Sequence, residues 1–443
     1  MERKITQFLI EWKNSQYRKP LVLQGARQVG KTYSLLAFGR EQYDNVAYFN
    51  FETNPGLIKT FDENIEPDYL IPILSRICGL SIVKERTLIF FDEVQLCERA
   101  LTSLKYFCES APEYHVVVAG SLLGVAVNRR AFSFPVGKVD IKTLYPMDME
   151  EFLLAFGERD LVLQIRECFN NDAPMPFALH DAALSYYRQY LVTGGMPECV
   201  KNYIETKDFI LLRHTQSLIL ESYLNDLSKY NRENEVKKTR LVYDNITDQL
   251  SRKNTRFQYK LIKSGVRARS RAAEFENAIE WLALSGIVNR IYMVEQPVKP
   301  LENYRNIDAF KIYVSDVGLL CAKKNIIAED ILYRSDELND FKGGMTENYV
   351  CNQLITNGYS CYFWMSERGA EVDFVIQHKG KIIPVEVKSS ENTKAKSLNV
   401  YIDTYKPAYA VKLSTKNFGF APAATASSAS GKKSVPLYAA FCL

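Results

Sequence analysis

The segment 25–32 reads Gly-Ala-Arg-Gln-Val-Gly-Lys-Thr, which matches the phosphate-binding pattern G-x-x-x-x-G-K-[ST] at every fixed position. The apolar run 21–23 before it predicts a strand, and residues 32–38 predict a helix. Glycines let such a loop turn its N–H groups inward, and the new helix adds its positive end. The segment therefore predicts a strand, a cradle for phosphate oxygens and a helix. A glycine-rich turn with a chance Lys-Thr pair is the alternative.

The side chains of this loop indicate how a nucleoside triphosphate would be held. Lys31 can reach the β- and γ-phosphates, and the hydroxyl of Thr32 can ligate Mg²⁺. We therefore expect ATP and Mg²⁺ as cofactors. The expected nucleotide-binding residues of this segment are Gly25, Ala26, Arg27, Gln28, Val29, Gly30, Lys31, Thr32 and Tyr33.

A second segment, 87–93, reads Thr-Leu-Ile-Phe-Phe-Asp-Glu and has the pattern of a buried parallel strand that ends in two carboxylates. The carboxyl ends of such strands are where α/β sheets bind ligands. We expect Asp92 to help hold Mg²⁺ and Glu93 to polarise the attacking water. A Glu directly after the metal-binding Asp favours ATP hydrolysis over transfer to a substrate hydroxyl. Two solvated carboxylates at the end of a buried strand are the alternative.

Composition limits the class of protein. A chain of 443 residues predicts about two to four domains. The nine cysteines include no C-x-x-C pair and the four histidines are far apart, which argues against zinc ribbons and disulfide frameworks. No apolar stretch approaches the roughly 20 residues that span a bilayer, and no signal-type apolar core follows the N-terminus. We therefore expect a cytoplasmic location and no membrane partner.

The first part of the chain alternates strands with helices, a pattern that predicts a parallel sheet wrapped by helices. Residues 147–234 then read as helical. The following segment, 235–325, combines two amphipathic helices with two strands, which favours a winged helix. The strands expected in the sheet are 21–24, 46–51, 87–91, 115–119 and 138–142, and those of the winged helix are 287–294 and 310–314.

A run of basic residues without any acidic residue lies between Ser251 and Ala273. Such a block can follow a nucleic-acid backbone, and it can equally be a solvated helix–loop face. Since the net charge of the chain is only +4, a basic patch has to be local. The residues are Arg252, Lys253, Arg256, Lys260, Lys263, Arg267, Arg269 and Arg271.

The last part of the chain carries a second set of candidate catalytic residues. Asp373 lies in a predicted strand, a turn follows at Gly380, and the next strand contains Glu386 and Lys388. Residues two apart on a strand share a face, so the Glu and the Lys point the same way. Asp373 and Glu386 could then bind Mg²⁺ while Lys388 positions water for attack on a phosphodiester. Glu347, from a predicted helix, would add a ligand.

The pattern of these residues is that of PD-(D/E)XK nucleases. An exposed hairpin with paired surface charges is one alternative, and a nuclease-like fold that no longer cleaves is another. The low-complexity stretch 421–431 interrupts an alternating pattern. We interpret it as the tip of a flexible loop that takes no part in the chemistry, and whether it is native to the fold is an open question.

With these motifs in place, the chain resembles a broad family of bacterial and archaeal AAA+ ATPases, related to the signal-transducing ATPases, that carry a C-terminal domain of unknown function. The resemblance implies an α/β fold in which an AAA+ P-loop core with a parallel five-stranded sheet is followed by a helical lid, a winged helix and a restriction-endonuclease-like domain. The expected boundaries are 1–146, 147–234, 235–325 and 335–443. The likeness rests on segments 25–32, 88–93, 119–123, 190–197, 310–320 and 371–389.

The same resemblance implies further site residues. Ser121 stands where AAA+ proteins sense the γ-phosphate, although it could also cap the next helix. Arg129 and Arg130 stand where an arginine finger reaches a neighbouring subunit, which implies a homo-oligomer; in a monomer they would be a solvated helix end. Pro197, in a Gly-Gly-x-Pro element, matches a nucleotide contact of the lid, with an interhelical turn as the alternative.

These expectations lead to one hypothesis and one rival. The first is a Mg²⁺-dependent ATPase that couples its nucleotide state to a DNA-facing, nuclease-like module, with defence against foreign DNA as a candidate role. The rival is a nucleotide-dependent switch whose tail is catalytically silent and only binds a partner. A P-loop kinase is a third hypothesis, and Glu93 argues against it.

Overall fold

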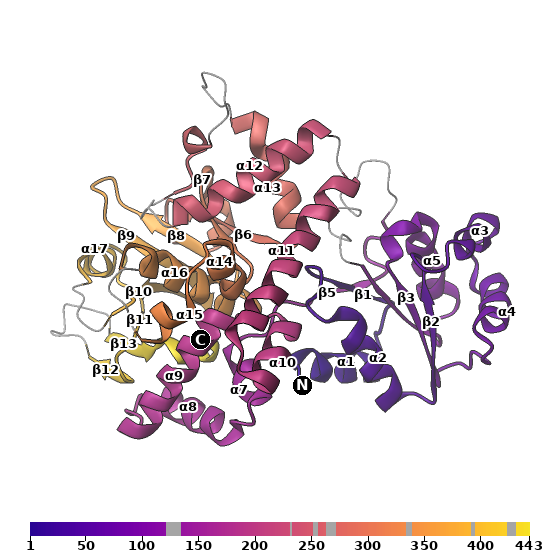
Figure 1. The fold of residues 1–443 in the computed structure, drawn as a ribbon, viewed down its shortest axis with the longest axis horizontal. Coiled ribbons are helices and arrows are strands. Elements are labelled where there is room, and N and C mark those ends of the chain that lie inside the picture. Colours follow the sequence, from indigo (N-terminus) through magenta and orange to yellow (C-terminus); the bar gives the residue numbers. More distant parts are fainter. Residues whose placement is uncertain are drawn as a thin grey trace. The chain divides into compact units, whose positions relative to one another are not determined.

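The protein is described from a computed structural model, which covers residues 1–120, 134–230, 233–250, 256–262, 272–333, 339–390, 395–422 and 431–443. The chain divides into two compact units, each described separately below (Figure 1). The first unit comprises Met1–Tyr145 with Leu284–Gly286, and the second comprises Pro146–Ala283 with Ile287–Leu443.

The first unit contains a five-stranded sheet in the order β2-β3-β4-β1-β5, and every pairing in it is parallel. The predicted α/β class and five-stranded parallel sheet are thus confirmed. The strands are β1 (Leu21–Gln24), β2 (Asn45–Asn50), β3 (Thr87–Asp92), β4 (His115–Ala119) and β5 (Asp140–Thr143). The helices are α1 (Lys4–Asn14), α2 (Lys31–Gln42), α3 (Gly56–Glu63), α4 (Pro67–Cys78) and α5 (Glu98–Ser110), with a short 3₁₀ turn at Val94–Leu96.

The order of the strands explains where a ligand can bind. All six residues of β3 and all five of β4 are buried, as expected for central strands covered on both faces. An aromatic cluster that includes Phe51, Phe61 and Phe91 packs on one face. Since β4 lies between β1 and β3, the loop after β1 and the end of β3 open onto the same carboxyl edge of the sheet.

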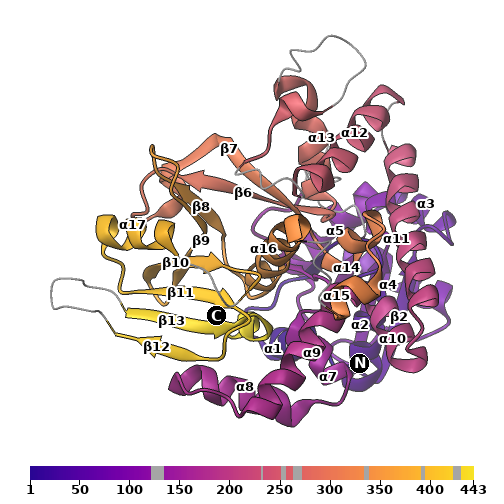
Figure 2. The same ribbon diagram turned by 60° about the vertical axis from the view of Figure 1, so that its left-hand side comes forward.

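The second unit contains an eight-stranded mixed sheet in the order β12-β13-β11-β10-β9-β8-β6-β7 (Figure 2). Its strands are β6 (Val288–Val294), β7 (Arg305–Val314), β8 (Tyr362–Met365), β9 (Glu371–His378), β10 (Lys381–Val387), β11 (Tyr409–Ser414), β12 (Gly419–Ala421) and β13 (Gly431–Pro436). Strands β8, β9 and β10 are antiparallel neighbours, and β11 then lies parallel to β10.

Helices precede and accompany this sheet. The segment expected to be helical contains α7 (Met149–Ala155), α8 (Arg159–Asn171), α9 (Phe177–Thr193), α10 (Pro197–Thr206) and α11 (Phe209–Tyr230). The other helices are α12 (Glu233–Leu250), α13 (Ala272–Leu284), α14 (Val317–Lys323), α15 (Ala328–Leu332), α16 (Asn339–Thr356) and α17 (Lys396–Tyr405). No helix in the described ranges is long and apolar enough to cross a membrane.

One arrangement differs from the sequence-based expectation. Strands β6 and β7 do form an antiparallel hairpin, as expected for a wing, but β6 also pairs with β8 through Tyr292 and Met293. The hairpin therefore belongs to the same sheet as the C-terminal strands, and a single sheet continues across the expected boundary at 325–335. The physical reason is burial: Ile291 and Val294 of β6 are at most 2% exposed within this sheet.

One buried carboxylate ties the turn between α9 and α10 to the start of α14. Asp316 is 1% exposed, and its Oδ1 accepts a hydrogen bond of 2.8 Å from Leu319 N, which caps α14. Its Oδ2 accepts a hydrogen bond of 2.6 Å from Gly195 N. A Cβ at Gly318 would lie 2.5 Å from Gly194 N, so only glycine permits this approach. The Gly-Gly-x-Pro element is thus an interhelical turn held by Asp316.

At pH 7, replacing Asp316 by Asn is expected to lower the free energy of unfolding by about 2 kcal/mol. The amide has one acceptor oxygen and would turn an N–H donor toward one of the two backbone donors. The matched change Asp308→Asn alters an exposed carboxylate on β7 and is expected to cost less than about 0.5 kcal/mol. Chemical denaturation of the full chain measures both values, and equal losses would contradict the assigned role.

The same residue predicts a pH dependence. Burial raises the pKa of Asp316 to about 6, from an ordinary 3.8. The folded state therefore binds the proton more tightly than the unfolded chain does. This contribution to stability is fully present below pH 3.8 and is lost as the pH rises through 6. Between pH 7 and pH 4, wild type is expected to gain on the order of 3 kcal/mol relative to Asp316→Asn.

Candidate functional sites

The backbone of the loop after β1 turns tightly and includes residues with positive φ. Gly30, which precedes α2, has φ 94°, and Gln28 has φ 65°, so both have a left-handed backbone. Gly25 has φ 145°, and a Cβ at this position would lie 2.1 Å from Leu144 O. The loop is anchored at the same point by a hydrogen bond of 2.8 Å from Leu144 N to Gln24 O. Backbone contacts therefore fix the loop that carries the motif against the segment after β5.

Gly25→Ala is expected to destabilise the chain by on the order of 3 kcal/mol and to remove nucleotide binding, because the collision is with backbone that cannot move aside. The control is Gly56→Ala at the first position of α3, where the nearest atom would be 3.4 Å away and the change is expected to be within about 1 kcal/mol. Denaturant unfolding and binding of a fluorescent ATP analogue measure the two effects. A Gly25→Ala protein with normal stability and binding would refute this role.

Lys31 is the first residue of α2 and is only 8% exposed. Its Nζ donates hydrogen bonds to Gly25 O at 2.9 Å and to Ala26 O at 2.8 Å. The ammonium is therefore held over the loop by two carbonyl groups.

The predicted Mg²⁺ ligands Thr32 and Asp92 meet directly. The hydroxyl of Thr32 donates a hydrogen bond of 2.9 Å to Asp92 Oδ2. Tyr48 on β2, which the sequence argument missed, donates a second one of 2.9 Å to the same oxygen. Burial is the main cause that raises the pKa of Tyr48 to about 12, so its phenol stays a donor. Hydroxyl and carboxylate oxygens are the ligands that Mg²⁺ prefers, so these residues fit the expected ion.

Glu93 follows Asp92 at the end of β3 and adopts a left-handed backbone, with φ 50°. Its N–H donates to Asp92 Oδ1 at 3.0 Å, and its own Oε2 accepts a hydrogen bond of 2.5 Å from Gln95 Nε2. The turn separates the two carboxylates, so that the side chain of Asp92 meets Thr32 while that of Glu93 points elsewhere.

The sequence predicts four further residues at the nucleotide site. Ser121, Arg129 and Arg130 lie outside the described residues. Pro197 is the first residue of α10 and belongs to the second unit. Its contact with a nucleotide therefore stays a prediction.

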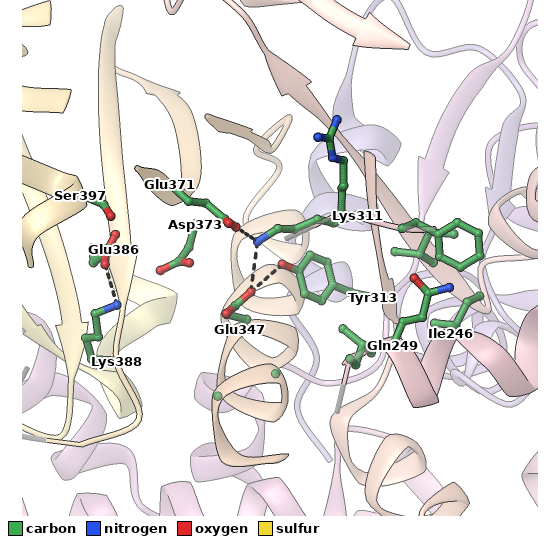
Figure 3. Close-up of a pocket in the computed structure, with 16 residues that line it drawn as sticks. Ile246, Gln249, Lys311, Tyr313, Glu347, Glu371, Asp373, Glu386, Lys388 and Ser397 are labelled. Carbon is green, nitrogen blue, oxygen red and sulfur yellow. Dashed lines mark hydrogen bonds and ion pairs between the residues drawn. The ribbon is translucent and has the colours of Figure 1, made fainter. Parts of the chain in front are cut away.

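A pocket of about 260 Å³ in the second unit is lined by all four residues of the predicted nuclease-like set (Figure 3). Glu347 comes from α16, Asp373 from β9 and Glu386 from β10, and Lys388 lies directly after β10. The wall also includes residues of α12, of the segment after it and of β7, several of them apolar. The lining residues are Ile246, Gln249, Leu250, Arg256, Phe257, Lys311, Ile312, Tyr313, Gly343, Gly344, Glu347, Glu371, Asp373, Glu386, Lys388 and Ser397.

Glu386 and Lys388 lie on the same face, as the strand spacing predicts. Lys388 Nζ is 2.6 Å from Glu386 Oε1, and the other oxygen of Glu386 is buried without a hydrogen-bond partner among the described residues. Burial raises the pKa of Glu386, although the neighbouring lysine opposes this effect. Burial disfavours the charge of Lys388, but the carboxylates of Glu386 and Asp373 outweigh it and raise the pKa of the ammonium.

Asp373 connects the two strands that carry the site. Its Oδ2 accepts a hydrogen bond of 2.7 Å from Val387 N on β10. Burial, together with the negative charges of Glu347 and Glu386, raises the pKa of Asp373 well above its usual range. Several acidic groups therefore share one poorly solvated space, which is the electrostatic condition for binding a cation or a proton.

Lys311, on β7, is the main residue that the sequence argument missed. Its Nζ lies 2.5 Å from Glu371 Oε1 and 3.4 Å from Glu347 Oε2 (Figure 3). Tyr313, two residues further along β7, donates a hydrogen bond of 3.0 Å to the same oxygen of Glu347. The signal in the sequence was a single lysine within the buried second half of β7, residues 309–314, which is otherwise apolar or aromatic.

The position of Glu347 is set by its neighbour in α16. The side chain of Asn348 accepts a hydrogen bond from Val314 N and donates one to Val314 O, both of 2.8 Å. This pair fixes α16 against β7 and brings Glu347 to Lys311 and Tyr313. Among the described residues, no three His, Cys, Asp or Glu side chains are arranged to hold one metal ion. The predicted ligand set with Glu347 as its third member is therefore not assembled.

Of the predicted metal ligands in this pocket, Asp373 and Glu386 are the two that could still bind a metal ion. Both line the pocket, and the orphaned Oε2 of Glu386 is an acceptor that a cation could use. Of the basic segment 252–271, Arg256 lines the same pocket. The other basic side chains of that segment lie outside the described part of the structure.

Three regions of the chain match known families. Residues 17–153 match the family described as "AAA domain". Residues 184–330 and 342–429 match two families described as "Domain of unknown function", DUF8612 and DUF4143. No curated protein matches the chain. The first unit is therefore an AAA-type ATPase domain with a parallel sheet and a phosphate-binding loop.

Similar solved structures cover most of the chain at low identity. The Walker-type ATPase PABY2304 of Pyrococcus abyssi is 15% identical, covers 73% of this chain and 95% of its own, and has a TM-score of 0.44. ORC2 of Aeropyrum pernix is 11% identical, with coverages of 75% and 91% and a TM-score of 0.34. A variant of RuvB from Thermotoga maritima is 14% identical, with coverages of 65% and 87% and a TM-score of 0.30. At these TM-scores, none assigns a function to the chain.

Proposed function

We propose that the protein binds and hydrolyses ATP with Mg²⁺ in its first unit and uses the nucleotide state to control a DNA-facing, nuclease-like second unit. The observation that carries the ATPase part is the hydrogen bond of 2.9 Å between Thr32 and Asp92. It joins the phosphate-binding loop to the end of β3. ATP hydrolysis needs Mg²⁺ ligands from both segments and a general base from the second.

Each residue at this site has a separate task. Backbone N–H groups of the loop bind the phosphate oxygens, and Lys31 balances their charge. Thr32 and Asp92 hold Mg²⁺, which when bound neutralises charge on the β- and γ-phosphates. Glu93 accepts a proton from the attacking water as the bond to the γ-phosphorus forms and the β–γ bridge breaks. ADP and inorganic phosphate are the products.

Lys31→Ala is the direct test of nucleotide binding. Loss of the ammonium group that the loop holds beside the phosphates is expected to weaken binding of a fluorescent ATP analogue by at least about 100-fold. Lys59→Ala, which removes an exposed lysine from α3, is the matched control and should bind as wild type does. Equal affinities of all three proteins would remove Lys31 from the site.

For the second unit, the order of elements supports a nuclease-like fold. Helix α16 is followed by the antiparallel strands β8, β9 and β10, then by α17 and by β11 parallel to β10. Asp373 lies on the second of these strands and Glu386 on the third, with Lys388 directly after it. Asp373 and Glu386 would hold Mg²⁺, which when bound polarises a phosphodiester oxygen. Lys388 would orient the attacking water.

A silent second unit is the alternative function, and one observation favours it. Glu347, the expected third ligand, is engaged by Lys311 and Tyr313. In that case the unit would bind DNA or another partner without cleaving it. Wild-type protein that binds DNA at low salt but cleaves nothing with Mg²⁺ or Mn²⁺ would establish this alternative.

Two further parts of the proposal concern assembly and setting. A ring or pair formed through the AAA-type unit would allow Arg129 or Arg130 of one protomer to reach the nucleotide of the next. The proposed setting is the cytoplasm, with defence against foreign DNA as the role. Mixing Arg129→Ala/Arg130→Ala protomers with Glu93→Gln protomers tests assembly. ATP hydrolysis is restored only if the intact arginines of one protomer complete the nucleotide site of a neighbour that keeps Glu93.

A further inference from the structure

The pocket in the second unit contains more acidic than basic side chains. Four carboxylates line it, those of Glu347, Glu371, Asp373 and Glu386. Three cationic side chains face them, and these are Lys311, Lys388 and Arg256. The two lysines each have a fixed position within this set.

Lys311 pairs with two of the four carboxylates that line the pocket. Its ammonium lies between Glu371 and Glu347, at 2.5 Å and 3.4 Å, and stands 5.3 Å from the centre of the Phe363 ring. Its side chain is 7% exposed, so this charge is held away from water. In contrast, Glu386 Oε2 is a buried acceptor without a partner in the described structure. Lys311 therefore already neutralises Glu347 and Glu371, whereas Glu386 keeps an unsatisfied oxygen beside its ion pair with Lys388.

We infer that Lys311 is a built-in counter-ion that takes the place of a second metal ion, so that the pocket binds a single divalent cation between Asp373 and Glu386. This inference rests on the proposed metal-binding function of the second unit. It concerns how many ions the site takes and which carboxylates hold them. Glu347 and Glu371 then serve to position Lys311 rather than to bind metal.

The physical basis is the cost of moving a buried charge. To bind a metal ion at Glu347 and Glu371, the protein would first have to remove an ammonium group from two carboxylates. A hydrogen bond from Tyr313 adds to the hold on Glu347. Glu386 also pairs with an ammonium, that of Lys388, but only through Oε1, and its buried Oε2 has no partner among the described residues and can accept a cation without breaking that pair. The first ion should therefore bind there, and a second should be excluded while Lys311 is present.

Counting bound Mn²⁺ tests the inference directly. The full chain is titrated without nucleotide, and every protein carries Asp92→Asn to remove the metal carboxylate of the first unit. The background protein is expected to bind one Mn²⁺. Lys311→Met should bind two, because Glu347 and Glu371 lose their counter-ion. The double change Lys311→Met/Glu371→Gln should return the count to one, since it removes one charge of each sign.

The outcomes separate this inference from the proposed function. A background protein that binds no Mn²⁺ would overturn both. A background protein that binds two, or a Lys311→Met protein that still binds one, would overturn only the role of Lys311. If Lys311→Met does not fold, anomalous scattering from Mn²⁺ in crystals of the wild type decides. A single peak beside Asp373 and Glu386 supports the inference, and a peak between Glu347 and Glu371 contradicts it.

Discussion

Glu93→Gln is expected to bind ATP as wild type does but to hydrolyse it about 10²- to 10⁴-fold more slowly, the usual contribution of a positioned general base. The amide keeps the size of the side chain and can still pair with Gln95, so the left-handed turn after β3 should be preserved. What it cannot do is accept the proton of the attacking water. Binding of an ATP analogue and steady-state release of phosphate measure the two properties separately.

Glu98→Gln is the matched control for this change. Glu98 is an exposed residue at the start of α5, a few positions further along the chain. It should leave both binding and turnover unchanged. Equal rates of hydrolysis in wild type and Glu93→Gln would show that another group acts as the base.

Lys388→Ala is expected to reduce cleavage of DNA by at least about 100-fold while ATP hydrolysis stays at the wild-type rate. The lysine is 2.6 Å from Glu386, so its loss removes the group that would orient water and leaves a buried carboxylate unpaired. ATP hydrolysis should be unaffected because the two sites belong to separate compact units. Conversion of supercoiled plasmid to the nicked form measures cleavage.

The lysine at the other end of β10 provides the comparison. Lys381, at the exposed start of β10, can be replaced by Ala without touching the pocket. Lys381→Ala should cleave as wild type does. If Lys388→Ala cleaves normally, the lysine is only a structural counter-ion of Glu386.

The sequence predicted the first unit well because its constraints are local. The loop 25–32, the strand before it and the carboxylates after β3 follow each other with fixed spacing, and each residue type has one chemical task. The parallel sheet followed from alternating strands and helices. Tyr48 could not be anticipated, since its approach to Asp92 depends on β2 lying beside β3, which is a feature of strand order.

The second unit was less predictable because its site combines distant segments. The pairing of Glu386 with Lys388 followed from strand periodicity alone. Lys311 and Glu371, in contrast, meet only because the hairpin of β6 and β7 joins the C-terminal sheet instead of forming a separate wing. The same arrangement affects the expected role of Glu347 as a metal ligand. Lys311, which comes from this hairpin, pairs with Glu347.

The central claim is that ATP in the first unit controls metal-dependent chemistry in the second. The most direct test is a nicking assay on plasmid and branched DNA with Mg²⁺ or Mn²⁺, with and without ATP. Wild type is compared with Lys31→Ala and Glu386→Gln. We expect the rate of cleavage by wild type to change when ATP is added. Cleavage by Lys31→Ala should not depend on ATP, and Glu386→Gln should not cleave DNA. Cleavage that is identical with and without ATP in all three proteins, or absent from wild type under every condition, would contradict the claim.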